Sequence, residues 1–469
     1  MTGTGPRPGR RGAEPCHAFV GARVLTMAPE RGSVEVVVTA GDRIAAVGTR
    51  ELLARFPDAE IHDLGGMTLC PGFIDAHHHL SIAALHPQWA DLRSVTDLEE
   101  LAAALAGQAR RRPEDPWIRG AGWSELSSGC TPHRRDLDAL GLDRPVLVAH
   151  YSLHQAVTDS RGLEALGIGE GAADPAGGSL GRDGDGRLDG LLVERAWSEA
   201  HSRSLAPYDD PERWATHIAA AGRALLRDGI TAVHDTACPP EAEAAYRQLA
   251  GSGRLPVSVL ACPHPRRLLG PADDGRLGDG PPTGEGDEWL RVGPAKIFAD
   301  GGVAPAIDVH LGGRRLALGM VFDDVAGQVE RATSMGYRVA VHAIGNAGLD
   351  VALDAFAATA SRHPGLDHRF RVEHACLASV PQLRRLAGLG GVAVVQPAFL
   401  DHLGRQVEGV VFDDADWLPF GAMRAAGVEM AASSDCPCTF HEPLRGAGHG
   451  TDRRTGSGAV LDEGQSVPF

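Results

Sequence analysis

The sequence predicts an α/β protein, a (β/α)₈ TIM-like barrel preceded by a β-rich segment. After residue 68 the chain contains eight short apolar runs whose apolar residues are continuous, as in parallel strands covered on both faces. Between most of these runs lie stretches rich in Ala, Leu and Arg, several of which end at a glycine, the usual stop of a helix. Eight strands with interleaved helices are typical of a barrel whose active site lies at the carboxyl ends of the strands.

The first part of the chain has a different composition and residue pattern. Residues 1–16 are basic, rich in Pro and Gly, and lack the apolar stretch of a secretory signal, so we expect a disordered tail. Residues 17–68 contain short runs rich in β-branched residues and broken by Gly and Asp, which predicts strands. These runs lie at 18–27, 33–49 and 59–69.

We assign the barrel to residues 69–446. Residues 86–210 do not fit a minimal barrel, and we expect an insertion there, either between the first two strands or around the second. Residues 262–289 have the composition of an irregular surface loop. The eight expected strands lie within residues 68–77, 144–154, 229–236, 291–302, 337–345, 369–375, 391–399 and 428–437.

Composition excludes several classes of partner. The formal net charge of −16 disfavours nucleic acid and anionic membrane surfaces. No window approaches the roughly 18 apolar residues of a membrane span. The eight cysteines have no regular spacing, which argues against a disulfide framework. We therefore expect a cytoplasmic protein.

Most of the predicted strands end in a residue that binds metal or moves protons. His77 and His79 close the first strand, and their spacing of two places both side chains on one face. Because the carboxyl ends of barrel strands meet at one mouth, these imidazoles should lie near the polar residues of the later strands. Such a set suits Zn²⁺. The later residues are Lys296, His342, His374 and Asp435.

Each residue also has a structural interpretation. A single histidine at a strand end is more often a hydrogen-bonded core residue than a ligand, and only the ordered set makes metal binding the better hypothesis. Lys296 has the alternative of pairing with Asp300 or Asp435 at the mouth.

Five motifs in order resemble the metal-dependent amidohydrolase superfamily, and within it the amidohydrolase-3 (YtcJ-like) branch. Further segments at 150–168 and 177–197 are similar to the same branch, so that the resemblance covers nearly the whole chain. The five motifs are "PGFIDAHHHL" (71–80), "AKIFADGG" (295–302), "HAIGNAGLDVALDA" (342–355), "RVEHA" (371–375) and "SSDCP" (433–437).

The resemblance implies a barrel joined to a small β-sandwich, with one or two divalent ions, expected to be Zn²⁺, in the site. It implies that His77 and His79 hold one ion, that His342 and His374 hold another, and that a carboxylated Lys296 bridges them. An uncarboxylated amine, with a pKa near 10.4, is a poor ligand at neutral pH.

The resemblance also implies an activity, the hydrolysis of a C–N bond in an amide or formamide by metal-activated hydroxide. Asp435 would then carry protons to the leaving amine. His154 resembles a histidine near the substrate, with a structural hydrogen bond as its alternative. Two other functions stay open, hydrolysis of an ester or cyclic amide, and a non-catalytic, truncated protein that binds metal without turnover.

The end of the chain departs from the family pattern. After "SSDCPC" the family continues with a helix that closes the barrel and with strands that complete the sandwich, whereas this sequence stops at "GQSVPF". We therefore expect a C-terminal tail at 447–469, truncated before the last barrel helix, and a sandwich that retains only its N-terminal part, 17–68. Such a fold would be weakened or would depend on a homo-oligomer.

Overall fold

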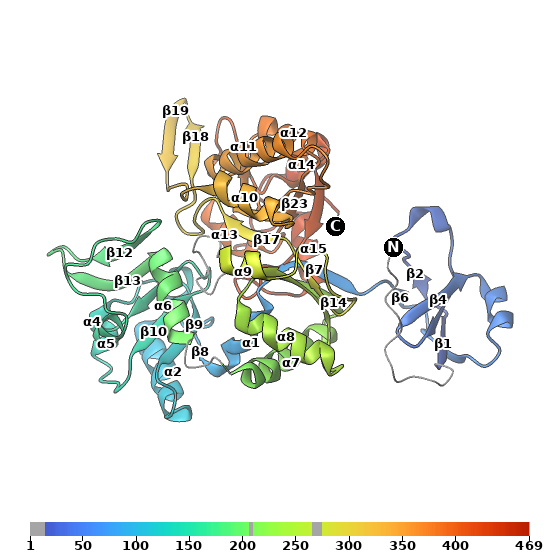
Figure 1. Cartoon of the computed structure of the whole chain (residues 1–469), viewed down its shortest axis with the longest axis horizontal. Coiled ribbons are helices and arrows are strands. Elements are labelled where there is room, and N and C mark those ends of the chain that lie inside the picture. The colour runs from blue at the N-terminus through green and yellow to red at the C-terminus, as the bar shows by residue number, and fades with distance from the viewer. Residues whose placement is uncertain (1–14, 206–209, 265–273, 469) are drawn as a thin grey trace. The chain divides into compact units, whose positions relative to one another are not determined.

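The computed structural model describes residues 15–205, 210–264 and 274–468 (Figure 1). The chain divides into two compact units, Met1–Phe73 and Ile74–Phe469. Of the expected tail at 1–16, residues 1–14 lie outside the described part.

The first unit is a small β-sheet unit. Its four-stranded sheet has the order β4-β3-β1-β5, in which β1 is antiparallel to β3 and parallel to β5. Ala18 and Val20 alternate with outward residues along β1 and pack with Val36 and Val38 against the second of two short 3₁₀ helices. The strands are β1 (Cys16–Val20), β2 (Arg23–Val24), β3 (Val36–Ala40), β4 (Arg43–Gly48), β5 (Glu60–Asp63) and β6 (Thr68–Leu69), and the 3₁₀ helices are Pro29–Arg31 and Arg50–Arg55.

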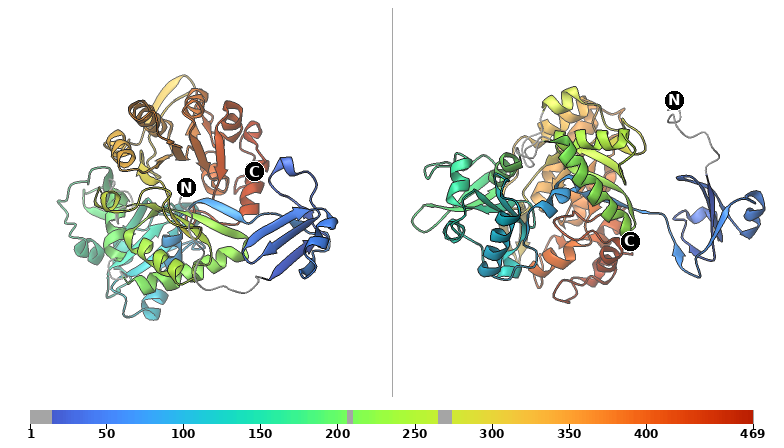
Figure 2. Two further views of the ribbon diagram at one scale, coloured as in Figure 1. Left: turned by 45° about the vertical axis from the view of Figure 1, so that its right-hand side comes forward. Right: turned by 90° about the horizontal axis from the view of Figure 1, so that it is seen from below.

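The second unit contains eight barrel strands among its described residues. They are hydrogen-bonded in two parallel arcs, β16-β15-β14-β7 and β17-β20-β21-β23-β25, with β16 as a short extra strand ahead of β17. Helices follow the strands and cover them from outside (Figure 2). The strands are β7 (Phe73–His78), β14 (Ile230–Cys238), β15 (Ser258–Pro263), β16 (Leu290–Val292), β17 (Ala295–Phe298), β20 (Val339–Ala343), β21 (Arg371–His374), β23 (Val392–Val395) and β25 (Glu429–Ala432).

Two backbone hydrogen bonds join the ends of these arcs. The amide of Asp435 donates to the carbonyl of His77 (2.7 Å), and the amide of His79 donates to the carbonyl of Cys436 (2.8 Å). They hold the segment after β25 against the end of β7, although the paired residues are 358 and 357 positions apart in the sequence.

One expected barrel strand is wrong and one was missed. The run at 144–154 forms β10 (Val146–His150), which lies inside the insertion between β9 and β11. The barrel strand missing from the prediction is β15, which begins before the expected loop at 262–289. Because all five residues of β10 are buried, its apolar run has the same pattern as a barrel strand. Of that expected loop, residues 265–273 lie outside the described part.

The insertion at 86–210 therefore lies between the first two barrel strands. It builds its own six-stranded sheet, in the order β12-β13-β11-β10-β9-β8, around a separate apolar core (Figure 1). Its elements are a 3₁₀ helix (His86–Gln88), β8 (Ala90–Asp91), α2 (Leu98–Arg111), β9 (Ile118–Trp123), α3 (Glu125–Ser128), α4 (Arg134–Asp138), β10, β11 (Gln155–Thr158), α5 (Ser160–Ala165), β12 (Gly178–Arg182), β13 (Leu188–Glu194) and α6 (Arg195–Leu205).

Several helices of the barrel begin at capping residues that the sequence provides. Asp210 caps α7 by accepting from the amide of Glu212, and Ser379 and Gln382 form a reciprocal capping box at α12.

No helix in the described ranges is both long and apolar enough to cross a membrane. The helices are α1 (Leu80–Leu85), α7 (Pro211–Arg227), α8 (Pro240–Gly251), α9 (Asp274–Asp279), α10 (Val325–Ser334), α11 (Asn346–Arg362), α12 (Val380–Gly388), α13 (Phe399–Gln406) and α14 (Phe420–Ala426). Two further strand pairs are β18 (Ile307–Leu311) with β19 (Arg314–Leu318), and β22 (Leu377–Ala378) with β24 (Asp416–Trp417).

The end of the chain differs from the expected tail at 447–469. A helix, α15 (Pro443–Asp452), follows β25, and a 3₁₀ turn follows at Glu463–Gln465. Val467 is 2% exposed and belongs to the same apolar core as Phe420 and Met423. The eighth strand therefore does have a following helix, and the residues beyond that helix pack on the barrel.

Arg453 anchors this C-terminal segment. Its fully buried side chain donates to the carbonyl oxygens of Leu418 and Leu461, each at 3.0 Å. Hydrogen bonds from a charged group are worth roughly 1.5–3 kcal/mol each, and a carbonyl left unsatisfied in the core adds to the loss.

We expect Arg453→Met to lower the free energy of unfolding by about 2–4 kcal/mol. Urea denaturation followed by circular dichroism measures it. Arg454→Met is the matched control, because Arg454 is the exposed neighbour, and we expect it to change stability by less than about 0.5 kcal/mol. Equal effects of the two substitutions would contradict this anchoring.

Candidate metal centre and substrate pocket

Three ligand atoms converge where the barrel closes. Nε2 of His77 lies 3.2 Å from Oδ1 of Asp435, and Nε2 of His79 lies 3.1 Å from the same oxygen. All three side chains are buried, and together they form a group able to hold a metal ion. Neighbouring ligand atoms about 3.3 Å apart are what tetrahedral bonds of about 2.0–2.1 Å require.

The partners of the other ring nitrogens explain why these atoms are acceptors. Nδ1 of His77 donates to a carboxylate oxygen of Glu373, and Nδ1 of His79 donates to the carbonyl oxygen of Thr236 at 2.6 Å. In the neutral imidazole the Nε2 atoms then carry lone pairs. Nε2 of His77 and Oδ1 of Asp435 are buried without a well-formed hydrogen bond among the described residues. Lone pairs that face one another in this way fit a cation between them.

Glu373 orients His77 and was not singled out from the sequence. It lies on β21, is fully buried, and also accepts from the guanidinium of Arg371. Burial favours the protonated form of Glu373, but the charges of Arg371 and His77 outweigh it and hold its pKa well below the usual range. A Glu inside an apolar strand is buried at a cost unless a charged group pairs with it. Its place in the predicted strand was therefore the sequence feature that could have identified Glu373 as a site residue.

Asp435 is also held as a carboxylate. Burial raises its pKa, but attraction to a cationic partner, foremost a protonated His77, outweighs burial and holds the pKa well below its ordinary value. The set of strand-end groups predicted to suit Zn²⁺ included Asp435, and the resemblance gave it a role in proton transfer; in the structure its carboxylate lies against the imidazoles of His77 and His79.

His342 and His374 lie beside this group. Their ring centroids are 4.6 Å apart, and that of His374 lies 4.7 Å from that of His77. Burial lowers the pKa of His374 to about 3 and that of His342 well below its ordinary value, so that both rings are neutral, as ligands must be. Nδ1 of His374 is 2.8 Å from Oε1 of Gln396, which fixes its tautomer and leaves Nε2 as the acceptor.

Lys296 lies in the same pocket, on β17. It is 1% exposed, and burial lowers its pKa below the ordinary value, while the charges of Glu373 and Asp435 partly oppose the shift. Asp300, one of its expected alternative partners, instead accepts three backbone hydrogen bonds, from the amides of Ile344, Gly345 and Ala306. Burial raises the pKa of Asp300 to about 7.

His154 enters the pocket from the insertion. It follows β10, which is not a barrel strand, and its ring centroid lies 5.4 Å from that of His342. Its Nδ1 is 2.6 Å from Oε2 of Glu194, a buried residue with φ of 51° at the end of β13. Glu194 also accepts from the amide of Val303 at 3.1 Å, so that one carboxylate ties His154 to the loop after β17. The sequence prediction did not include Glu194.

The pocket is a cavity of about 470 Å³. Six of the seven sequence-predicted residues line it, and the seventh, His77, lies fully buried behind them; the six are His79, His154, Lys296, His342, His374 and Asp435. The walls add aromatic and apolar side chains from the insertion and from the loops of the barrel. These are Tyr151, Leu153, Phe298, Ile344, Phe399, Leu403, Val407 and Trp417.

Comparison with known proteins agrees with this geometry. The model of the amidohydrolase family (Amidohydro_3) matches residues 60–469. N-substituted formamide deformylase of Arthrobacter pascens is 30% identical over 96% of this chain and 86% of its own length. YtcJ of Bacillus subtilis (strain 168) is 26% identical over the same shares.

Two solved structures are similar over most of their length. They are uncharacterized metal-dependent hydrolases of Pyrococcus furiosus (TM-score 0.71) and Pyrococcus horikoshii OT3 (TM-score 0.73), each 26% identical over 96% of this chain. The matches cover 91% and 89% of those chains. With its family match, its barrel and its buried His-His-Asp group, the chain belongs to the amidohydrolase family of metal-dependent hydrolases, in the YtcJ-like branch.

Proposed function

We propose that this protein hydrolyses a C–N bond of amide or formamide type in a small, uncharged molecule. The observation that carries the proposal is the convergence of lone pairs from His77, His79 and Asp435 at a cavity of about 470 Å³. The activity in the name of the Arthrobacter pascens relative, deformylation of N-substituted formamides, supports the same bond class.

The residues fit one or two divalent ions, for which Zn²⁺ is the best candidate. His77, His79 and Asp435 would hold one, and His342 and His374 would contribute to a second, with Lys296 between them if its amine is carboxylated. When bound, such an ion lowers the pKa of a water ligand toward about 7 and polarises the scissile carbonyl.

The chain's own groups supply the proton transfers. Asp435 is a carboxylate at the pocket surface, so it can accept a proton from the attacking water and deliver it to the leaving nitrogen. An amine is a poor leaving group until it is protonated, which makes this step necessary. We propose that His154, whose Nδ1 lies 2.6 Å from Oε2 of Glu194, donates from Nε2 to the carbonyl oxygen of the substrate when both ring nitrogens carry protons.

The pocket lining favours a substrate with an apolar or aromatic N-substituent. Tyr151, Phe298, Phe399 and Trp417 offer ring faces and edges, and Lys296 is the one Lys or Arg among the lining residues that the structure describes. No Arg and no second Lys among these lining residues would pair with a carboxylate of the substrate, so we propose neutral amides.

The proposal is tested by activity and metal content together. We expect the protein as purified to contain one or two Zn²⁺ per chain and to release amine from N-formyl and N-acyl amines. Removal of the metal by a chelator should abolish turnover, and added Zn²⁺ should restore it. Turnover of esters alone would exclude C–N hydrolysis, and metal content without turnover of any substrate would favour a non-catalytic metal-binding protein.

We expect Asp435→Asn to lower kcat by about 10²–10⁴ when assayed at saturating Zn²⁺, because the amide cannot accept the proton. Metal content measured on the same sample separates loss of proton transfer from loss of the ion. Asp401→Asn is the control, since Asp401 pairs with Arg445 at 3.0 Å outside the pocket lining. Retention of wild-type kcat by Asp435→Asn with its metal bound would contradict the assignment.

We expect Glu373→Gln to weaken Zn²⁺ binding by about 10–100-fold, since the partner that fixes the tautomer of His77 loses its charge. Equilibrium dialysis measures the affinity, and circular dichroism verifies the fold. Glu330→Gln removes the charge of another Glu–His pair, with His363 at 2.7 Å, and should leave the affinity unchanged. Equal affinities of Glu373→Gln and the wild type would show that Glu373 does not support the site.

A further inference from the structure

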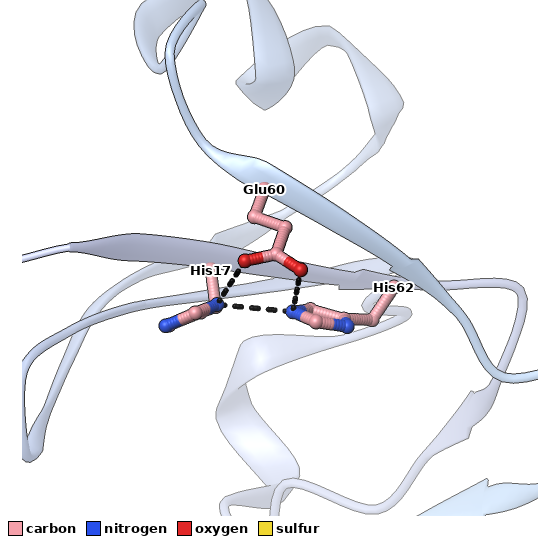
Figure 3. A group of neighbouring side chains, drawn as sticks. All are labelled: His17, Glu60 and His62. Carbon is pink, nitrogen blue, oxygen red and sulfur yellow. Dashed lines mark hydrogen bonds and ion pairs between the residues drawn. The ribbon is translucent and has the colours of Figure 1, made fainter.

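A second group of possible metal ligands lies in the first unit, on strands β1 and β5. His17 comes from β1, and Glu60 and His62 come from β5, the edge strand of the four-stranded sheet. Figure 3 shows the three side chains turned toward one another. None of them belongs to the barrel, and nothing in the proposed hydrolytic function uses them.

The strand register brings these residues together. In the parallel pairing of β1 with β5, His17 lies opposite Glu60, and Phe19 lies opposite His62. Because side chains alternate along a strand, His17 and Phe19 share one face while Ala18 and Val20 point into the core. The ring of Phe19 stacks on that of His62 with centroids 5.1 Å apart, which restrains the second imidazole.

The ligand atoms are close enough to share one ion. Nδ1 of His17 is 3.0 Å from Nε2 of His62, and these nitrogens lie 3.5 Å and 3.9 Å, respectively, from the two carboxylate oxygens of Glu60. Bonds of about 2.0–2.2 Å to one ion place neighbouring ligand atoms about 3.0–3.5 Å apart, so the first two distances fit directly, and the carboxylate of Glu60 would move about 0.4 Å toward His62. A single proton between the two nitrogens satisfies that pair alone, whereas a divalent cation satisfies both nitrogens and the carboxylate.

The donor set selects the kind of ion. Two imidazoles and one carboxylate suit Zn²⁺ and its neighbours in the first transition series, whereas Mg²⁺ and Ca²⁺ prefer oxygen ligands. The side chains of His17 and His62 are about one-third exposed, 33% and 35%, so water can complete the coordination.

We propose that His17, Glu60 and His62 form a second, surface Zn²⁺ site that ties the edge strand β5 to β1. The site is independent of the barrel centre, and because it is exposed it binds its ion more weakly and exchanges it with solvent. Its effect is structural, since an ion that bridges the two strands opposes the opening of a four-residue edge strand.

The full-length protein tests this with Zn²⁺ itself as the probe. The barrel centre is first saturated, and equilibrium dialysis at micromolar free Zn²⁺ then counts the additional ions. We expect His17→Gln and His62→Gln each to bind one Zn²⁺ fewer than the wild type, with unchanged amide hydrolysis. His310→Gln is the control, because His310 is an exposed histidine that pairs with Asp414 at 2.8 Å outside this group.

Amide hydrogen exchange supplies a readout that is independent of stoichiometry. In the wild type we expect Zn²⁺ to slow exchange across β5 at least tenfold, and in His62→Gln we expect no slowing. Equal Zn²⁺ stoichiometry in the wild type and both histidine variants, or exchange in β5 that does not respond to Zn²⁺, would overturn the proposal and leave a hydrogen-bonded histidine pair. Loss of hydrolysis alone would bear on the barrel and not on this site.

Discussion

The two backbone hydrogen bonds that close the barrel determine where its chemistry lies. They join the segment after β25 to the end of β7, and they set the carboxylate of Asp435 against the two imidazoles of β7. Every other candidate residue of the barrel is placed by a strand that pairs, directly or through its neighbours, with one of these two.

Buried charge is stable at this centre because each ionised group has an assigned partner. Arg371 neutralises Glu373, Glu373 fixes the tautomer of His77, and a backbone carbonyl does the same for His79. The imidazoles that face the pocket are thereby directed before any ion arrives. Because the ligands are already ordered, the ion binds without the loss of conformational entropy that ordering them would require.

The sequence predicted the family, the barrel and the residues that surround the pocket. These residues could be recognised because they are His, Lys or Asp, which bind metal or move protons, and because they stand at the ends of apolar runs. It did not predict the partners that orient them. The Thr236 carbonyl has no sequence signature, and Gln396 and Glu194 are recognisable only once their neighbours are known. These contacts depend on tertiary structure and not on local pattern.

The errors in the predicted fold have equally physical causes. β10 was taken for a barrel strand because a strand buried on both faces has the same apolar run in any sheet. The helix α15, "PLRGAGHGTD", was missed since three glycines in ten residues give it a low intrinsic helix propensity. Packing of the residues that follow it, down to Val467, compensates for that weakness.

The insertion gives the pocket a wall of separate origin. Tyr151 and His154 come from a sheet with its own core, whereas the candidate ligands all stand on the barrel. The residues of the insertion can therefore be altered without changing the candidate ligands on the barrel. Re-engineering the loops around β10 and β11 should change which substrate is accepted while the candidate ion-binding residues stay in place, which makes this sheet the natural place to alter specificity.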